Sequence, residues 1–519
     1  MKKYLSILML MAMCLSAQAQ ALSVGATDIN LSKDGTYYDA TGILTYKYYY
    51  QEKKLEFYSN TIAGKIVSSV NDLKIVFHGT NVIMAIVETS AALVLNADTH
   101  LISDGLVSIR GKLDSGDDET NYNSVMITKS KVDISGGTWK LQGSVFLRAA
   151  GNIPELIIKD GADVSVKSNM NNQVGIGTSS SYYGESGLVT VDNSTLTVET
   201  TATGNCSNAR ISLTNCVIAQ PLKVVHEGNG PLYDTKGEHL EGWLYIKPGI
   251  AYDLWICGVQ VNSENIDNIW KLEQNGTSSD RRLIYTPSSK LLELNRATLN
   301  SEYVSHPPIL NKVKGLRIYY YDNCYIGTSS NSGWVGIKSY ADCTIRMGGV
   351  KGVLNVKGHS SDYGNAISVL DNSTLNIEKT SLIAEGERYG LYVSGGIINV
   401  YNSYLTISGE KQAIYCSGSF DPDNNCAIVK PVNGRKRNNT VYESDGTTIS
   451  KYVELVPMSS IITGVGQVGE ITEETDEPLS VYTTSGQLVW QGKGSPQLPR
   501  GIYVVKQGGK ARKALITGK

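Results

Sequence analysis

Four carboxylates lie together in one short polar stretch of the chain. Asp114, Asp117, Asp118 and Glu119 fall within residues 112–120, and carboxylate oxygens are ligands that calcium binds. Their spacing lacks the D-x-D-x-D-G order of an EF-hand loop. Two interpretations are open, a calcium site and a solvated acidic loop, and we expect the loop. We predict no other metal site and no cofactor.

Residues that could catalyse a reaction are scattered and form no active-site motif. The six histidines show no pair at metal-ligand spacing, and the sequence has no G-x-S-x-G, H-E-x-x-H or phosphate-binding loop. Gly358-His359-Ser360 is the nearest fragment to the Gly-His-Gly of pectin-type hydrolases, and the rest of that motif is missing. We predict no catalytic residues. A polysaccharide lyase or glycoside hydrolase stays open as an alternative, because paired carboxylates on different repeats would not show in the sequence.

Tyrosine clusters are the other candidates for binding. An exposed tyrosine ring can stack on a sugar, whereas alternating tyrosines in a strand more often form cross-strand pairs, with half of them facing inward. The tryptophans at 139, 243, 255, 270 and 334 are expected to pack within strands. The candidates for sugar stacking are Tyr48, Tyr50, Tyr182, Tyr183, Tyr319 and Tyr321.

Seven cysteines follow the first nineteen residues, and they allow two interpretations. The odd number leaves at least one thiol that is free or pairs between chains, and no spacing matches a zinc site. The disulfide candidates are Cys206, Cys216, Cys416 and Cys426. The other interpretation, which we favour, is that the cysteines are small buried hydrophobic residues.

The elements that must position these residues are repeated. The stretch 191–198 (VDNSTLTV) recurs as 370–377 (LDNSTLNI) and 400–407 (VYNSYLTI), and residues 216–221 (CVIAQP) match 426–431 (CAIVKP). Repetition of a strand–corner–strand unit at intervals of tens of residues indicates a solenoid. We predict a tandem duplication, with copies at 20–250 and 251–457. The 400 stretch is then the duplicate of the 191 stretch, and the 370 stretch lies on a neighbouring coil.

Each copy shows a finer period of about 30 residues. Equivalent strands are expected at Val132, Val164 and Leu196, and again at Leu375 and Leu405. Short apolar/polar alternation broken by Asn, Asp, Gly or Ser predicts about three half-buried strands per period, with few helices. The predicted fold is therefore all-β, with two tandem right-handed parallel β-helices. The hairpin-like starts and the proline-bounded ends of the copies are expected to cover their open edges.

The two ends of the chain predict export. Residues 1–19 have two lysines, a short apolar run and an Ala17-Gln18-Ala19 cleavage site, typical of a signal peptide. We favour soluble export over a lipoprotein attached at Cys14. No later segment is long and apolar enough for a transmembrane helix. The net charge of −2 gives no argument for a nucleic-acid partner.

The last 41 residues, 479–519, follow a Gly-rich and acidic linker at 458–478. Residues 481–489 (VYTTSGQLV), 498–506 (LPRGIYVVK) and 510–516 (KARKALI) resemble, in order, the motifs of the type IX secretion system C-terminal sorting domain of Bacteroidota. The resemblance implies a small β-sandwich, passage through the periplasm, the outer-membrane type IX machinery as a partner, and a secreted or outer-membrane surface location. The repeats look like β-helical, carbohydrate-binding-like modules of secreted proteins from the same bacteria.

Together these features predict an exported, non-catalytic β-solenoid that acts as an adhesin or glycan-binding protein. Its partner would be a polysaccharide or a host glycan. The alternatives are the lyase or hydrolase and a protein-binding surface scaffold. Ligand identity, tail cleavage and oligomeric state stay open.

Overall fold

A computed structural model describes residues 20–516 apart from short stretches. The stretches outside the description are 87–90, 112–122, 150, 169–173, 179–186, 202–204, 227, 235, 268, 270–281, 302–305, 329–334, 360–363, 423–425, 463–477, 484–485, 494–497, 499–500 and 508–509. The described residues divide into two compact units. The first comprises residues up to Leu292 with Leu299–Val313, and the second comprises Glu293–Thr298 and residues from Lys314 onward. The boundary predicted at 250 and 251 comes from the duplicated sequence and stays a prediction.

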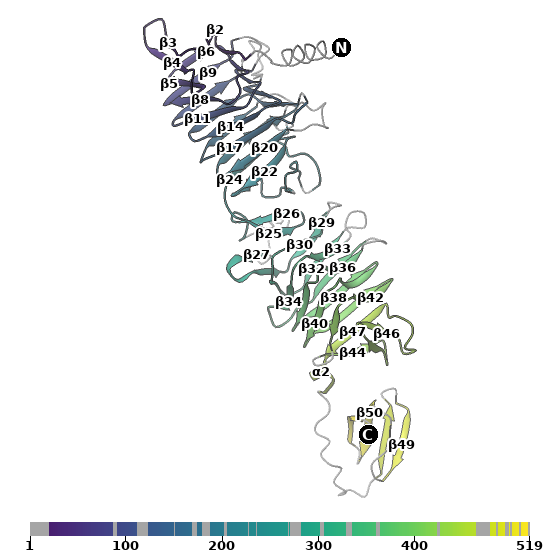
Figure 1. Cartoon of the computed structure of the whole chain (residues 1–519). Helices are drawn as coiled ribbons and strands as arrows, with labels where there is room; N and C mark the ends of the chain where they lie inside the picture. Colours follow the sequence, from purple (N-terminus) through teal and green to yellow (C-terminus); the bar gives the residue numbers. More distant parts are fainter. Residues whose placement is uncertain are drawn as a thin grey trace, which may run out of the picture. The chain divides into compact units, whose positions relative to one another are not determined.

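The first unit contains a parallel β-helix, which we call the first helix, built from three sheets of seven, nine and eight strands. Each coil contributes one strand to each sheet, and successive coils pair in parallel, so that β8, β11, β14, β17, β20 and β22 follow one another in one sheet (Figure 1). The strands of its coils are β7 (Ile66–Ser68), β8 (Leu73–His78), β9 (Thr80–Met84), β10 (Leu93–Leu95), β11 (Thr99–Ser103), β12 (Leu106–Arg110), β13 (Val125–Thr128), β14 (Lys131–Ser135), β15 (Thr138–Gln142), β16 (Val145–Arg148), β17 (Glu155–Lys159), β18 (Asp163–Lys167), β19 (Ile176–Gly177), β20 (Leu188–Asp192), β21 (Thr195–Glu199), β22 (Arg210–Thr214) and β23 (Cys216–Gln220).

Alternation along each strand explains why the coils stack. Val164 and Leu196 lie opposite each other in neighbouring strands and are fully buried, while the residues directly before and after each of them in its own strand face outward. One coil cannot bury its own apolar row, so the row is buried only when the next coil covers it. The stacked rows form one continuous core through the first helix.

The second unit contains the coils that we call the second helix. Parallel pairing joins β31, β34, β37, β40 and β43 in one sheet, β32, β35, β38 and β41 in the next, and β33, β36, β39 and β42 in the third. The bounds are β31 (Leu316–Tyr321), β32 (Cys324–Thr328), β33 (Val335–Ser339), β34 (Cys343–Met347), β35 (Leu354–Gly358), β36 (Asn365–Val369), β37 (Thr374–Glu378), β38 (Ser381–Gly386), β39 (Tyr389–Val393), β40 (Ile397–Tyr401), β41 (Tyr404–Gly409), β42 (Gln412–Cys416), β43 (Ser419–Asp421), β44 (Cys426–Lys430), β45 (Arg435–Arg437), β46 (Thr440–Tyr442) and β47 (Tyr452–Pro457).

Antiparallel strands cover the first edge of the first helix. The hairpin of β3 and β4 pairs with β5, and β1 pairs antiparallel with β2 and β7, which confirms the covering role predicted for this start. The bounds are β1 (Leu22–Val24), β2 (Thr27–Asp28), β3 (Gly35–Tyr38), β4 (Leu44–Tyr49), β5 (Lys54–Tyr58) and β6 (Thr61–Ala63).

The proline-bounded ends of the two copies close their coils in the same way. Strand β24 (Trp243–Pro248) lies antiparallel between β21 and β23, and β47 lies antiparallel between β41 and β44. The register shifts at Ile218/Gln220 in the first copy and at Ile428/Lys430 in the second. We call β24 and β47 the closing strands. Their shared pairing pattern supports the duplication.

The remaining elements lie at the start of the second copy and in the tail. The strands are β25 (Ala251–Ile256), β26 (Val259–Asn262), β27 (Arg282–Thr286), β28 (Leu291–Asn295), β29 (Thr298–Ser301), β30 (Ile309–Asn311), β48 (Leu479–Thr483), β49 (Leu488–Gly492), β50 (Gly501–Gln507) and β51 (Lys510–Ile516), with a short 3-10 helix η1 (Pro287–Ser289) and the helix α2 (Met458–Ile462). The last four strands form one antiparallel sheet in the order β49, β48, β50, β51, where the sequence predicted a small sandwich. None of the described helices is long and apolar enough to cross a membrane.

The predicted positions of the strands need two corrections. Val164 and Leu196 do pair, but Val132 lies in a different sheet and pairs with Leu156. Leu375 and Leu405 also lie in different sheets, opposite Ile398 and Leu382 respectively. All three sheets carry the same Val/Ile/Leu alternation, so a period of about 30 residues cannot tell which sheet a strand joins.

The repeated stretches occupy corners of the coils. Residues 191–198 turn from β20 into β21, and residues 400–407 turn from β40 into β41, with Asn193 and Asn402 at φ 43° and 46°. Asparagine tolerates this left-handed conformation. The 370 stretch turns from β36 into β37, on the coil before that of the 400 stretch and at a different corner. It is therefore a similar corner and not a repeat of the same one.

Candidate functional site

The closing strand of the first helix places two aromatic rings in solvent. Its Trp-Leu-Tyr-Ile sequence alternates, and Leu244 and Ile246 are fully buried. Side chains on a strand point to opposite faces in turn, so Trp243 and Tyr245 face outward. Ile246 lies opposite Leu196 in the register, which fixes which face of β24 enters the core.

The two rings stack against each other. Their centroids are 5.9 Å apart and their planes differ by 12°. The Trp243 side chain is 44% exposed, and Tyr245 is half-buried. An indole held this way is already ordered, so a ligand that stacks on it orders few additional rotatable bonds.

Polar residues of the neighbouring strands share the outward face with the two rings. Glu199 lies opposite Trp243 and Thr197 lies opposite Tyr245 in the antiparallel pairing. The Nζ atom of Lys167 lies 3.0 Å from Oε1 of Glu199. We call these five residues the closing-strand platform. It combines an apolar ring face with a hydroxyl, a carboxylate and an ammonium group, which are the groups that hydrogen-bond sugar hydroxyls.

The second closing strand carries a related arrangement. Because Leu405 pairs with Leu455 as Leu196 pairs with Ile246, Tyr452 occupies the position of Trp243. The Tyr452 side chain is 40% exposed, and its hydroxyl donates a hydrogen bond to Glu454. Lys430 lies 2.9 Å from the same carboxylate and 5.5 Å from the centre of the Tyr452 ring. The hydrogen bond to Glu454 raises the pKa of Tyr452, so the phenol stays protonated near neutral pH.

The tyrosines that the sequence suggested for sugar stacking differ in their exposure to solvent. Tyr48 is only 2% exposed, which removes it as a stacking residue, whereas Tyr50 is 42% exposed after β4. Tyr319 and Tyr321 are half-buried on the solvent face of β31, with the fully buried Tyr320 between them. Tyr182 and Tyr183 lie outside the described residues, as do Asp114, Asp117, Asp118 and Glu119.

The prediction that the tryptophans pack within strands holds for Trp139 and fails for Trp243. Trp139 is fully buried and contacts Phe77 edge-on, with ring centroids 5.6 Å apart. Trp243 is exposed because the antiparallel closing strand buries only its other face. The sequence did contain a signal for this exposed site: two aromatic residues two positions apart, Trp243 and Tyr245, in a strand that ends at Pro248. Trp270 and Trp334 lie outside the described residues.

The four disulfide candidates, Cys206, Cys216, Cys416 and Cys426, are free and buried. The amide of Ser194 donates to the sulfur of Cys216 at 3.4 Å, and the amide of Ser403 donates to Cys426 at the same distance. Burial raises the pKa of Cys206 to about 12. These thiols fill the core between coils, as the favoured interpretation expected.

Histidine and carboxylate side chains form pairs on the surface. His78 Nδ1 lies 2.7 Å from Asp104, His100 Nδ1 lies 2.5 Å from Asp133, and His359 forms an ion pair with Glu387. Within the described ranges, no group of three or more His, Cys, Asp or Glu side chains could hold a metal ion. Each of these contacts joins side chains from two successive coils.

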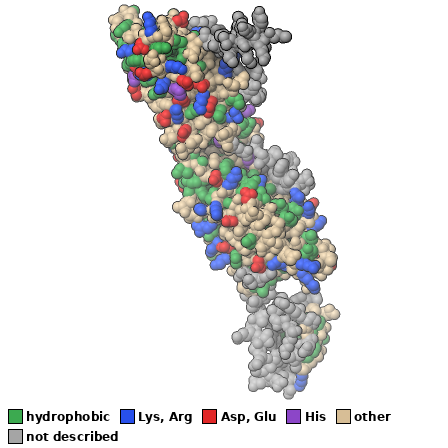
Figure 2. Space-filling view, in the orientation of Figure 1, with side chains coloured by type: hydrophobic (Ala, Val, Ile, Leu, Met, Phe, Trp, Pro, Cys, Tyr) green, Lys and Arg blue, Asp and Glu red, His purple; other side chains and the backbone are tan. Residues whose placement is uncertain are grey.

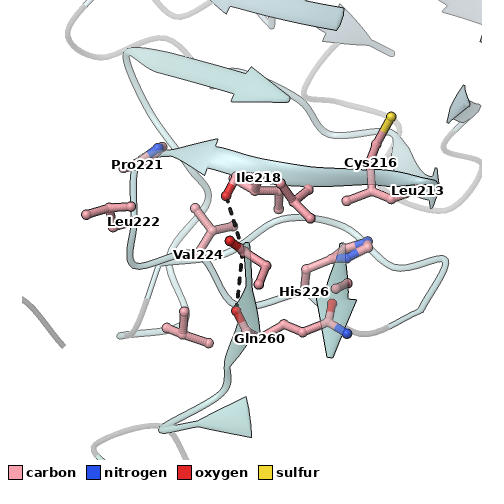
Figure 3. Close-up of a pocket in the computed structure, with 12 residues that line it drawn as sticks. Leu213, Cys216, Ile218, Pro221, Leu222, Val224, His226 and Gln260 are labelled. Atoms are coloured by element: carbon pink, nitrogen blue, oxygen red, sulfur yellow. Dashed lines mark hydrogen bonds between the residues drawn. The ribbon is translucent and has the colours of Figure 1, made fainter. Parts of the chain in front are cut away.

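A small cavity lies beside β23, β25 and β26 (Figure 3). It is lined mainly by apolar side chains, including Leu213, Ile218 and Val224, and it holds about 20 Å³. That volume admits about one water molecule. Asn262 closes one side by donating to the carbonyl oxygens of Ile218 and Gln260, each at 3.5 Å. The cavity is a gap in packing and is too small for a sugar.

Comparison with known proteins gives no relative: no protein-family model, no curated protein and no solved structure matches the chain.

Proposed function

We propose that the chain is an exported, non-catalytic β-helical protein that binds polysaccharide. The observation that carries this proposal is the closing-strand platform, where Trp243 is 44% exposed and stacked on Tyr245 beside Glu199 and Lys167. An aromatic ring that is already ordered by stacking, and that lies beside hydrogen-bonding groups, offers a sugar ring both an apolar face and partners for its hydroxyl groups.

Export is supported by the signal-like residues 1–19 and by the resemblance of residues 479–519 to a type IX sorting domain. A protein delivered by that route would work at the outer-membrane surface or outside the cell. An extended polymer suits a solenoid, because the sheet faces repeat the same surface at intervals of about 4.8 Å.

Affinity electrophoresis through gels containing neutral polysaccharides tests the proposal. Trp243→Ala should weaken retention about fivefold or more, since one aromatic stacking contact is worth roughly 1 kcal/mol or more. Tyr38→Ala is the matched control, because Tyr38 is an aromatic residue 62% exposed on β3 of the same helix. Equal retention of the parent and of Trp243→Ala would overturn the proposal that the closing-strand platform binds polysaccharide. Release of reducing ends or of unsaturated products would favour a glycoside hydrolase or lyase instead.

A further inference from the structure

A second surface, on the second helix, has a different chemistry. On the solvent face of β31 and β34, two arginines lie against one tyrosine ring. We propose that Arg317, Tyr319 and Arg346, which we call the arginine–tyrosine face, bind the carboxylate or sulfate groups of an acidic polysaccharide. This proposal deepens the proposed function and rests on it, since it assumes that the chain binds polysaccharide.

The register of the sheet brings the three side chains together. Tyr319 lies directly opposite Arg346 on the neighbouring strand, and Arg317 precedes Tyr319 by two residues on the same face. The Cζ atoms of Arg317 and Arg346 lie 5.7 Å and 5.6 Å from the centroid of the Tyr319 ring. Both distances fall within the range of cation–π attraction.

Holding two guanidinium groups against one ring has an electrostatic consequence. The Tyr319 ring attracts each cation and so holds both guanidinium groups at one point of the surface. A bound anion would accept charge-assisted hydrogen bonds from the planar guanidinium edge of Arg346. Carboxylate and sulfate match this geometry, and both occur on acidic polysaccharides.

The acidic residues nearby do not neutralise Arg346. Glu378 lies opposite Arg346 on β37, but among the described residues the guanidinium group of Arg346 lies over the Tyr319 ring and forms no ion pair with Glu378. Glu293 accepts a hydrogen bond from the hydroxyl of Tyr321 at 2.9 Å. The positive charge of Arg346 is therefore shared with the Tyr319 ring and not with a carboxylate among the described residues.

Amide and hydroxyl groups continue this surface along the sheet. Thr344, Asn376 and Asn399 lie in one row that begins opposite Arg317. Asn399 Nδ2 donates to Asn376 Oδ1 at 2.9 Å, and Asn376 Nδ2 donates to Thr344 Oγ1 at 3.5 Å. Such a row offers donors and acceptors to the hydroxyl groups of successive sugar units.

The charge of the chain favours a local site over general attraction to polyanions. Figure 2 shows Lys and Arg side chains over the segment coloured green in Figure 1, among many neutral groups. The whole chain carries a net charge of −2, so no strong positive field would draw in a nucleic acid. Local cations that contact one anionic group, with hydroxyl-binding groups beside them, are enough to bind an acidic polysaccharide.

The test is affinity electrophoresis of the full chain through gels containing polygalacturonate, chondroitin sulfate or neutral hydroxyethylcellulose. The parent should be retained by at least one acidic polymer, and Arg346→Gln should weaken that retention about tenfold or more. Arg346→Lys should recover only part of it, because lysine keeps the charge and loses the planar fork. The polygalacturonate and chondroitin sulfate gels distinguish carboxylate from sulfate.

Arg435→Gln is the matched control, because it removes an equal charge from an exposed residue of β45. If Arg435→Gln weakens retention as much as Arg346→Gln does, binding is nonspecific and the proposal is wrong. Retention by hydroxyethylcellulose alone would overturn this inference while leaving the proposed function intact. A parent that no gel retains would overturn both. Circular dichroism of each variant confirms that the β-structure is kept.

Discussion

The hydroxyl group of Tyr320 ties two sheets of the second helix together through its core. It donates a hydrogen bond to the carbonyl oxygen of Ser381 and accepts one from the Ser381 amide, each at 2.8 Å. It accepts a third, also at 2.8 Å, from the hydroxyl of Thr380. Tyr320 is fully buried, and burial raises the pKa of its phenol, so the group stays neutral. All hydrogen-bonding capacity of the phenol oxygen is used.

Tyr320→Phe keeps the ring and deletes this oxygen alone. A hydrogen bond contributes about 1 kcal/mol net, and a buried donor left without a partner costs about 1–3 kcal/mol. Three bonds are lost and the Ser381 amide loses its acceptor, so we expect a destabilisation of about 2–4 kcal/mol. Tyr321→Phe is the control, because its hydroxyl makes one half-buried bond to Glu293. We expect that change to cost less than about 1 kcal/mol.

Hydrogen exchange measured by mass spectrometry is the suitable assay, because a chain with two compact units has no single free energy of unfolding. Exchange of the peptide that contains Ser381 should accelerate about 30-fold to 1,000-fold in Tyr320→Phe, since each 1.4 kcal/mol corresponds to a factor of ten. Peptides of the first helix should be unchanged. Equal protection of Ser381 in the parent and the variant would show that the phenol is not a tether and would refute the reasoning.

Two further predictions concern the core and the corners of the coils. Burial raises the pKa of Cys206 and of Cys343 to about 12, so iodoacetamide at pH 8 should label neither thiol until the chain is unfolded. Rapid labelling of the folded chain at pH 8 would contradict that expectation. The folded thiols stay neutral while unfolded thiols ionise above about pH 8.5. The stability of the fold should therefore decrease as the pH rises from about 8.5 towards about 12, which is measured as a lower Tm. Gly386→Ala would place a Cβ atom 1.9 Å from the carbonyl oxygen of Tyr389, so the backbone must move and we expect a loss of about 2 kcal/mol or more. Hydrogen exchange around β38 should become faster. Gly349→Ala controls for the added methyl group, because the nearest atoms to its Cβ lie at ordinary contact distances of 3.7 Å and 3.8 Å; equal exchange in the two variants would contradict the prediction.

Much of the architecture could be predicted because solenoids depend on local rules. Apolar/polar alternation along a half-buried strand turns Leu196 and Leu375 inward, and both are fully buried. Asn193 and Asn402, which interrupt the alternation, have the left-handed conformation that a sharp corner requires. The closing segments were found from prolines and position. In each case, a short stretch of sequence was enough to decide the local structure.

The identity of the neighbouring strand could not be predicted, because every coil carries nearly the same pattern. Val132 shows this, since its alternation matches that of Val164 although the two strands belong to different sheets. The sequence left two interpretations of the cysteines open for a related reason. Disulfide pairing depends on the direction of each side chain in space, and sequence spacing gives only their order.

The binding surfaces are hard to predict for a deeper physical reason. In a parallel β-helix, the nearest outward neighbour of a residue lies one coil away, so a surface cluster is assembled from positions about 20–30 residues apart or more. Arg346 meets Tyr319 across such a step, and Lys167, Glu199 and Trp243 meet across two. A search for contiguous motifs therefore does not find these clusters. A contiguous run of tyrosines, such as the one around Tyr48, suggests a binding surface where half of the rings are buried. It follows that single substitutions at Arg346 or Trp243 should reduce binding while leaving their own strand intact, whereas Leu196 or Leu375 should affect folding first. Separating those two outcomes, by exchange and by gel retention on the same variants, distinguishes residues that form the scaffold from residues that bind.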